Sequence, residues 1–315
     1  MWNILVHIFP YAIAFAMPLL ITSLGGLFSE RSGVVNIGLE GLMVVGGFAS
    51  AAFTVSLQPS LGTSAIWLSL LVAMAIGALF SVLHAFASIN LNADQVISGT
   101  AINMIAGAVT VYLARMVTGS GNIQLTHGIP RFDVPGLADL PIIGHLFFYQ
   151  TYGTTWLILA LVVFGAFLLY KTAFGLRLRA CGEHPHAADA AGVNVKKIRY
   201  IAVMISGAFG GLGGATILVT YSGEFSGSVA GMGFLALAAL IFGQWKPLGI
   251  LGATFFFGFA ATLANSSQAE PALQAIPEMV LKVFPYVVTL LALVLFSKST
   301  QAPRAAGEPF EKGKR

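Results

Sequence analysis

Charged residues are scarce in this sequence: Asp, Glu, Lys and Arg together make up 9% of its 315 residues. A soluble domain of ordinary composition contains roughly 25% charged residues, which cover its surface with groups that water solvates well. Hydrophobic residues make up 57% of the chain, so a soluble globule would expose large apolar areas to water. The composition therefore excludes a soluble globular protein and predicts an all-α, polytopic transmembrane helical bundle.

Cysteine and the common catalytic motifs are also nearly absent. Cys181 is the single cysteine of the chain, which excludes an internal disulfide. The phosphate-binding pattern G-x-x-x-x-G-K-[ST] does not occur, which excludes the usual P-loop ATPase within this chain. Cys181 lies near His184 and His186 in sequence, but this arrangement is more typical of a neutral surface than of a metal site. We therefore expect no enzyme activity, no metal and no cofactor.

Long apolar segments are what the sequence does contain, and a spanning helix needs about 20 such residues. We expect about nine spans, with eight to ten as the range, in a transmembrane domain at residues 1–297 that precedes a tail at residues 298–315. The segments at 155–170 and 230–244 are short enough to be extended, re-entrant or half-buried. The nine predicted spans are residues 4–28, 37–57, 66–89, 96–117, 155–170, 200–221, 230–244, 248–265 and 278–297.

Basic residues gather at two places, and cytoplasmic loops of membrane proteins have an excess of Lys and Arg. The loop at 171–199 and the tail are therefore predicted to be cytoplasmic, which agrees with the even number of spans between them. The same count places the 118–150 segment outside as an irregular loop with a short helix. We expect residues 302–315 to be disordered or loosely surface-bound, and the charge indicates a lipid bilayer and not nucleic acid as partner. The basic residues are Lys171, Arg177, Arg179, Lys196, Lys197 and Arg199 in the loop, and Lys298, Arg304, Lys312, Lys314 and Arg315 in the tail.

Two polar, glycine-containing breaks interrupt the apolar pattern, at residues 29–41 and 221–233. Glu40 follows the first break inside a predicted span, and an intramembrane carboxylate indicates a functional site because it is costly to keep there. Its alternatives are a place near the cytoplasmic interface, or pairing with Arg31 or with Asn36 on the same helix face. Paired breaks also occur in transporters with inverted repeats, which is one hypothesis for this chain.

Glycine is abundant in the predicted span at 200–221, where it has four-residue spacing. Gly207 with Gly211, and Gly210 with Gly214, form G-x-x-x-G pairs, which allow helices to approach closely in lipid. We interpret them as packing residues and not as a nucleotide-binding loop. The spacing continues at Gly223, Gly227 and Gly231.

The cytoplasmic loop contains signals for one short helix. Pro185 is suited to the first helical turn, alanines favour the helix, and Gly192 is a natural stop. Such a helix would present small residues on the cytoplasmic side. We therefore predict that it binds a partner protein.

The same loop resembles the coupling loop of permease subunits of ABC importers for branched-chain amino acids, ribose and nucleosides. The resemblance is in Gly-Leu-Arg-Leu-Arg-Ala at 175–180, Gly-Glu-His-Pro at 182–185 and Gly-Val-Asn at 192–194. The family more usually has Asn at the position of His184. Residues 29–43, 233–247 and 309–315 are similar to the nucleoside-uptake branch of this family.

The resemblance implies a permease subunit of the bacterial inner membrane, without its own ATPase site. It would form the path with a second homologous permease, receive solute from an extracytoplasmic substrate-binding protein and bind a cytoplasmic ATP-binding subunit. The residues it assigns to that last contact are Glu183, Ala187, Ala188 and Gly192.

A nucleoside has a flat base and a hydroxylated sugar without charge, so its path needs aromatic faces and hydrogen-bonding side chains. Core packing is the alternative role for each residue chosen on this basis. Branched-chain amino acids or sugars are the alternative solutes, and a stand-alone secondary transporter is the alternative class. The predicted path residues are Asn36, Glu40, Phe53, Gln95, Asn103 and Tyr221.

Overall fold

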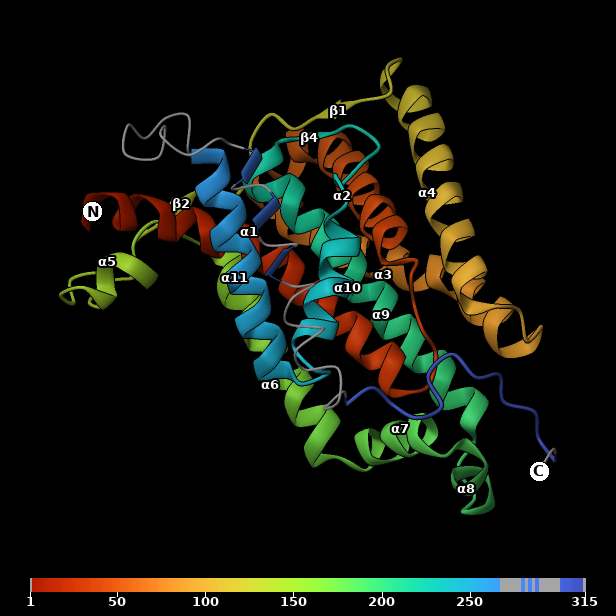
Figure 1. Cartoon of the computed structure of the whole chain (residues 1–315). Coiled ribbons are helices and arrows are strands. Elements are labelled where there is room, and N and C mark those ends of the chain that lie inside the picture. The colour runs from red at the N-terminus through yellow and green to blue at the C-terminus, as the bar shows by residue number, and fades with distance from the viewer. Residues whose placement is uncertain (1, 267–278, 281–282, 285–286, 289–300, 314–315) are drawn as a thin grey trace.

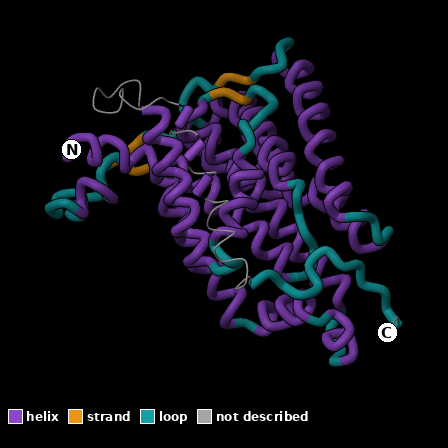
Figure 2. Tube along the Cα trace, viewed as in Figure 1, coloured by secondary structure: helices purple, strands orange, loops and turns teal. Residues whose placement is uncertain are grey.

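Helices make up most of the described chain (Figure 2). The structure is a computed structural model, and it describes residues 2–266, 279–280, 283–284, 287–288 and 301–313. Seven helices in this part are long and apolar enough to cross a membrane. They are α1 (Trp2–Arg31), α2 (Leu39–Leu61), α3 (Thr63–Ala85) with its π-helical extension η1 (Phe86–Asn90), α4 (Gln95–Thr118), α6 (Gly153–Lys171), α9 (Val195–Ile217) with its π-helical extension η2 (Leu218–Ser222), and α11 (Pro247–Ser266).

The remaining elements are short. Two pairs of two-residue strands tie the 118–152 region to itself and to the segment after η2: β1 pairs with β4, and β2 pairs with β3, both antiparallel. The predicted short helix of the 118–150 segment is present, but no local signal predicted strands this short. These elements are α5 (Ile143–Phe147), α7 (Ala173–Glu183), α8 (Pro185–Ala190), α10 (Met232–Phe242), β1 (Ile123–Gln124), β2 (Arg131–Phe132), β3 (Thr151–Tyr152) and β4 (Glu224–Phe225).

The predicted all-α polytopic bundle is confirmed. Seven of the nine expected spans correspond to the long helices. The expected span at 230–244 is instead α10, whose 11 residues are too few to cross alone. The ninth expected span, residues 278–297, lies mostly outside the described residues.

Helix α9 lies at the centre of the bundle, packed against α1, α2 and α3 (Figure 1). Glycines make this close packing feasible: a Cβ at Gly207 would collide with the Gly77 carbonyl, and one at Gly214 would collide with the Met43 carbonyl. The predicted packing role of the α9 glycines is therefore confirmed. Helix packing is not the role of three others, which lie outside helices with φ of +66°, +79° and +81°: Gly223, Gly227 and Gly231. Of these, only Gly227 is in close contact, because a Cβ there would collide with Val111 Cγ2.

Helices α3 and α9 have matching construction. Each has 23 α-helical residues followed by a five-residue π-helical extension. They cross in opposite directions, because Gly207 lies against Ser81 and Gly211 lies against Ala73. The inverted repeat stays a prediction, which these equal lengths and opposite directions support.

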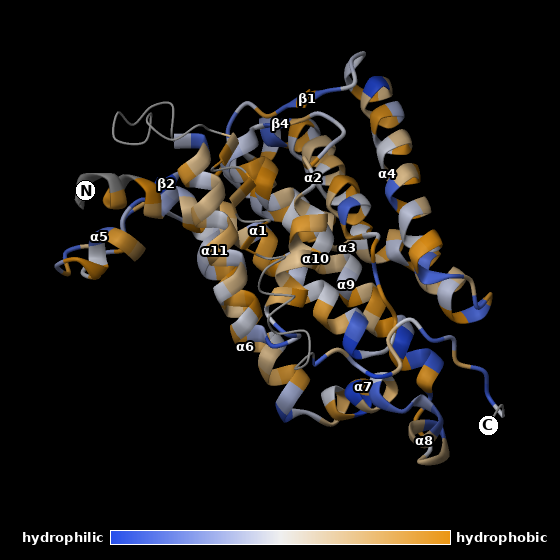
Figure 3. Cartoon of the chain, viewed as in Figure 1, coloured by the Kyte–Doolittle hydropathy of each residue, from blue (hydrophilic) through white to orange (hydrophobic). Residues whose placement is uncertain are grey.

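Polar residues gather at the end of the bundle that contains α7 and the chain's C-terminal segment (Figure 3). Backbone hydrogen bonds join this segment to the body: Ala305 N donates to Gly182 O, and Gly307 N donates to Gly33 O. The 171–199 loop and the tail thus lie on the same side, as expected. The expectation of a loosely bound tail is wrong for this segment, because Ala305 and Phe310 are 4% and 5% exposed.

Candidate functional site

Helix α10 begins about halfway through the depth of the bundle. From β4 at one end, the chain runs without helix over residues 226–231 before α10 starts at Met232. Its 11 residues extend roughly 16 Å, about half of the ~30 Å hydrocarbon core. A helix that starts at this depth exposes backbone N–H groups that have no partner within the helix.

Glu40, in the first turn of α2, supplies that partner. Its Oε1 accepts a hydrogen bond from Gly231 N at 2.9 Å, and its Oε2 accepts one from Gly233 N at 2.7 Å. A carboxylate is favourable here because the N-terminal end of a helix is electropositive. The start of α2 packs against Gly210, near the middle of the span Val195–Ser222, so Glu40 lies near mid-depth.

The contacts of Glu40 correct three expectations. It does not lie near the cytoplasmic interface, and it pairs with neither Arg31 nor Asn36. Asn36 instead donates through Nδ2 to Ser206 Oγ at 2.9 Å and accepts from Gly38 N at 3.1 Å. The two polar breaks, which are distant in sequence, meet at the start of α10.

The segment at residues 32–38, between α1 and α2, re-enters the bundle without helix or strand. Gln95 of α4 accepts a hydrogen bond from Val35 N at 2.6 Å, and His84 Nε2 lies 3.0 Å from Val35 O. The other ring nitrogen of His84 lies 3.0 Å from Ser98 Oγ. Irregular backbone at membrane depth needs such partners, because lipid supplies none.

Asn103 completes this set of backbone contacts from α4. Its Oδ1 accepts from Gly41 N at 2.7 Å, and its Nδ2 donates to Ile37 O at 3.0 Å. In this conformation Gln95 and Asn103 therefore hold the re-entrant segment. Sequence reasoning missed His84, although a histidine inside an otherwise uncharged span was a usable signal.

Tyr221 joins the same region, whereas Phe53 does not. The Tyr221 hydroxyl donates to Met232 Sδ at 3.2 Å, and its ring stacks on Phe15 with centroids 6.0 Å apart. Both rings line a cavity of about 370 Å³ together with Tyr11, Ala14, Arg131, Thr262, Asn265 and Ser266. Phe53 lies more than three turns beyond Glu40 on α2. Five of the six predicted path residues thus gather around the re-entrant segment and the start of α10.

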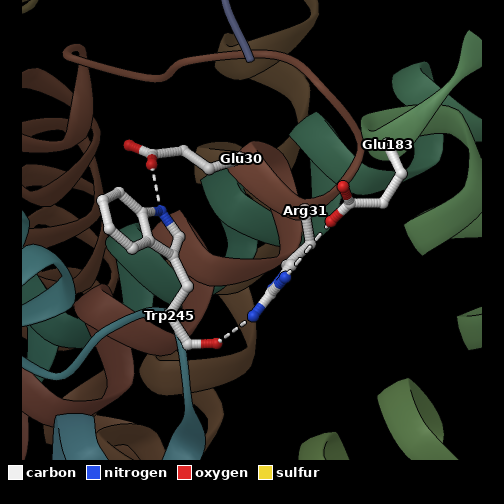
Figure 4. A network of polar contacts seen from close by, with 4 residues as sticks. All are labelled: Glu30, Arg31, Glu183 and Trp245. Atoms are coloured by element: carbon white, nitrogen blue, oxygen red, sulfur yellow. Dashed lines mark hydrogen bonds and ion pairs between the residues drawn. The ribbon is translucent and has the colours of Figure 1, made fainter. Parts of the chain in front are cut away.

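A second polar network joins the other end of α10 to α7 (Figure 4). Trp245, in the turn between α10 and α11, donates its indole N–H to Glu30 Oε2. Arg31 Nη2 donates to Trp245 O at 2.9 Å, and Arg31 Nη1 lies 3.7 Å from Glu183 Oε1. The end of α1 therefore contacts both the α10–α11 turn and the last residue of α7. Local sequence patterns did not indicate Glu30 or Trp245 as part of a site.

The predicted short cytoplasmic helix is present as α8. Pro185 occupies its first turn, His184 Nδ1 accepts from Ala187 N, and Gly192 follows its end with φ of +83°. Ala187 and Gly192 are exposed, but Ala188 is 5% exposed and packs into the core. The small-residue surface is therefore smaller than expected.

The candidate coupling and thiol residues on α7 have different environments. Glu183 is exposed on 46% of its side-chain surface despite its ion pair. Cys181 is fully buried, and burial raises the pKa of its thiol to about 11. The thiol is therefore protonated at neutral pH and lies in the core beneath α7. Of Glu183 and Cys181, Glu183 is therefore the residue that a partner protein can reach.

Comparison with known proteins gives consistent matches along the chain. The family described as branched-chain amino acid transport system / permease component matches residues 8–293. The guanosine ABC transporter permease protein NupQ of Bacillus subtilis is 50% identical over 315 residues, 99% of both chains. The nucleoside ABC transporter permease protein NupC of Lactococcus lactis is 43% identical, over 96% of both chains. A putative glucose ABC transporter permease protein of Haloferax volcanii, TsgC13, is 37% identical over 81% of this chain and 75% of its own.

Proposed function

Because the chain belongs to the family of branched-chain amino acid transport system permease components, we propose that it is the membrane-spanning subunit of an ATP-driven nucleoside importer. It is a multi-pass membrane protein and a transport component. The nucleoside assignment is supported by the two full-length relatives whose names specify guanosine or nucleosides. The bacterial inner membrane is the expected location of such a subunit.

One observation carries the mechanism: helix α10 joins a set of polar contacts at α7 to a second set of polar contacts at mid-depth. Glu183 of α7 contacts Arg31, and Arg31 contacts the turn at Trp245. Helix α10 follows from that turn to Gly231, which contacts Glu40. A rigid movement of α7 and α8 is thereby transmitted to the mid-depth contact between α10 and α2. Such a movement can produce alternating access if ATP and solute favour different conformations.

The surface for the ATP-binding subunit is the exposed part of α7–α8, where we place Glu183, Ala187 and Gly192 against that partner. Ala188 has a supporting role, because its side chain anchors α8 in the core. This partner supplies the ATP hydrolysis that the chain cannot perform.

The solute passes the start of α10 in this proposal. Glu40 joins the two polar breaks, and Asn103 and Gln95 hold the first break against α4. A change in these contacts opens or closes the path at mid-depth. Tyr221 and Phe15 offer aromatic faces on the way in, which suits a neutral nucleobase. A second permease completes the path, and an extracytoplasmic binding protein delivers the solute.

Uptake measurements on the complete transporter in proteoliposomes test the cargo. We expect labelled guanosine, adenosine or uridine to accumulate with ATP, and leucine, ribose and glucose to remain at background. Strong leucine or glucose uptake without nucleoside uptake would show that the assigned solute is wrong. Transport by this chain alone, without a co-purifying ATPase, would instead indicate a secondary transporter.

The partner surface is tested by enlarging Ala187, which is exposed on α8. We expect Ala187→Trp to weaken binding of the ATP-binding subunit at least about tenfold, equivalent to about 1.4 kcal/mol, because the indole separates the two surfaces. Affinity is measured by titrating the purified ATP-binding subunit onto the permease in nanodiscs.

Two variants serve as controls for this change. Ala187→Ser retains the size of the site, and Ala108→Trp adds the same indole to an exposed position on α4. Both are expected to bind the ATP-binding subunit as the unmodified chain does. If Ala187→Trp binds the ATP-binding subunit with unchanged affinity, α8 is not part of the interface.

A further inference from the structure

The C-terminal segment joins two parts of the cytoplasmic end that are distant in sequence. Ala305 N donates to Gly182 O of α7 at 2.9 Å, and Gly307 N donates to Gly33 O of the re-entrant segment at 3.1 Å. Only one residue, Ala306, lies between these donors. The segment therefore holds α7 beside the beginning of the re-entrant segment.

Arg199 of α9 strengthens the same junction from within. Its side chain is 1% exposed, its Nε donates to Ser32 O at 3.1 Å, and its Nη1 donates to Glu308 O at 2.9 Å. One guanidinium thus bridges the re-entrant segment and the tail. Gly33 makes room for it, because a Cβ there would lie 2.6 Å from Arg199 Nη2. A buried cation depends on such acceptors, so separating the two carbonyls is unfavourable.

The far end of the segment reaches α8. Phe310 is 5% exposed, and its ring centroid lies 5.2 Å from that of His186. Phe310 also lines a cavity of about 500 Å³ beside the turn between α8 and α9. Residues 302–310 therefore contact, in order, α7, the re-entrant segment and α8.

We propose that residues 302–310 and Arg199 form a clasp that makes α7, α8 and the re-entrant segment move as one body during transport. The inference rests on the proposed function, in which α8 receives the ATP-driven movement. Without the clasp, Gly182 of α7 would still pack closely against Arg31 O, but the polar side-chain contact left between α7 and the end of α1 would be the partly exposed Arg31–Glu183 pair, and such pairs contribute little. The clasp gives the movement a direct route to the re-entrant segment, which leads into α2 and Glu40.

Gly307 allows the clasp to be disrupted with a matched control. Its φ is +84°, which Asn tolerates and a β-branched residue does not, and the nearest atom to a new Cβ is 3.7 Å away. In the complete reconstituted transporter, we expect Gly307→Val to lower solute transported per ATP hydrolysed at least fivefold. Basal ATP hydrolysis and subunit assembly are expected to remain unchanged in Gly307→Val. Gly307→Asn is expected to retain coupling, that is, the amount of solute transported per ATP hydrolysed. If Gly307→Val and Gly307→Asn transport the same amount of solute per ATP hydrolysed, the proposed clasp is wrong.

A cross-link tests the same idea independently of folding effects. A Cβ at Gly307 would lie 3.7 Å from Val35 Cγ2, so we expect a Val35→Cys, Gly307→Cys pair in a Cys181→Ala background to form a disulfide on oxidation. Coupling in the oxidised transporter should equal that of the Cys181→Ala background, because the clasp stays closed throughout the cycle. Loss of uptake on oxidation and its return on reduction, or failure to cross-link, would refute the proposal.

Failure of the proposed function has a different signature. It appears as absent nucleoside uptake by the unmodified transporter, whereas failure of the clasp leaves the unmodified transporter active. Coupling is measured with whichever solute the unmodified transporter accumulates, so the clasp is tested in either case.

Discussion

Replacing Glu40 by Ala is expected to lower nucleoside uptake by more than about a hundredfold while the chain still inserts into the membrane. The substitution leaves Gly231 N and Gly233 N without their acceptors at mid-depth. A buried donor without a partner costs about 1–3 kcal/mol, and a shift of about 2.8 kcal/mol changes an equilibrium constant a hundredfold. The conformation in which α10 and α2 are joined would then be poorly populated. Initial uptake rates, normalised to the immunodetected chain in the membrane, measure the effect.

More conservative variants separate this role from solute binding. Glu40→Gln retains one acceptor oxygen, so its uptake should lie between those of the Ala variant and the unmodified chain. If Glu40 supports the conformation, the maximal rate falls; if it only binds solute, KM rises with the maximal rate unchanged. Asp139→Asn removes an exposed carboxylate elsewhere and should have no effect. Uptake of the Ala variant within twofold of the unmodified chain would contradict the prediction.

Adding one methyl group at Gly214 is expected to disrupt the centre of the bundle. A Cβ there would overlap the Met43 carbonyl, so α2 and α9 would have to separate along their contact. Overpacking of a core costs about 1–3 kcal/mol, and each kcal/mol lowers the unfolding midpoint by about 2–4 °C in a domain of 150–250 residues. We expect Gly214→Ala to lower the folded fraction recovered in detergent and the midpoint of thermal unfolding.

Gly252 provides the matched control for this change. It lies within α11, and a Cβ there would meet no atom within 4 Å. Since Ala is a better helix former than Gly by about 1 kcal/mol, Gly252→Ala should be neutral or slightly stabilising. If both variants unfold at the same temperature, close backbone approach at Gly214 is not what stabilises the bundle.

The features predicted correctly from sequence have local causes. Long apolar runs predicted seven of the long helices, and Pro185 with Gly192 predicted α8, because helix starts and stops depend on residues within a few positions. The glycine spacing failed at Gly231 for a related reason. Periodicity cannot show where a helix has already ended, and Gly231 lies beyond that end with a positive φ.

The candidate site was predicted in its residue types and not in its contacts. Asn36, Gln95 and Asn103 stand out because polar side chains are rare in these spans. Their hydrogen-bond partners lie on segments up to 170 positions away, and the sequence does not show which backbone groups lack partners. The docked tail was missed for the same reason, since its ordering depends on Arg199 and Gly33.

The short length of α10 has a consequence for how the chain is made. An 11-residue apolar stretch preceded by polar residues is a poor substrate for independent insertion during synthesis, which favours about 20 apolar residues. Two N–H groups at its N-terminal end, those of Gly231 and Gly233, are bonded to Glu40, which is synthesised about 190 residues earlier. Biogenesis therefore has an order: the first helices must be in place, with Glu40 at mid-depth, before α10 can pack against α1, α2 and α11.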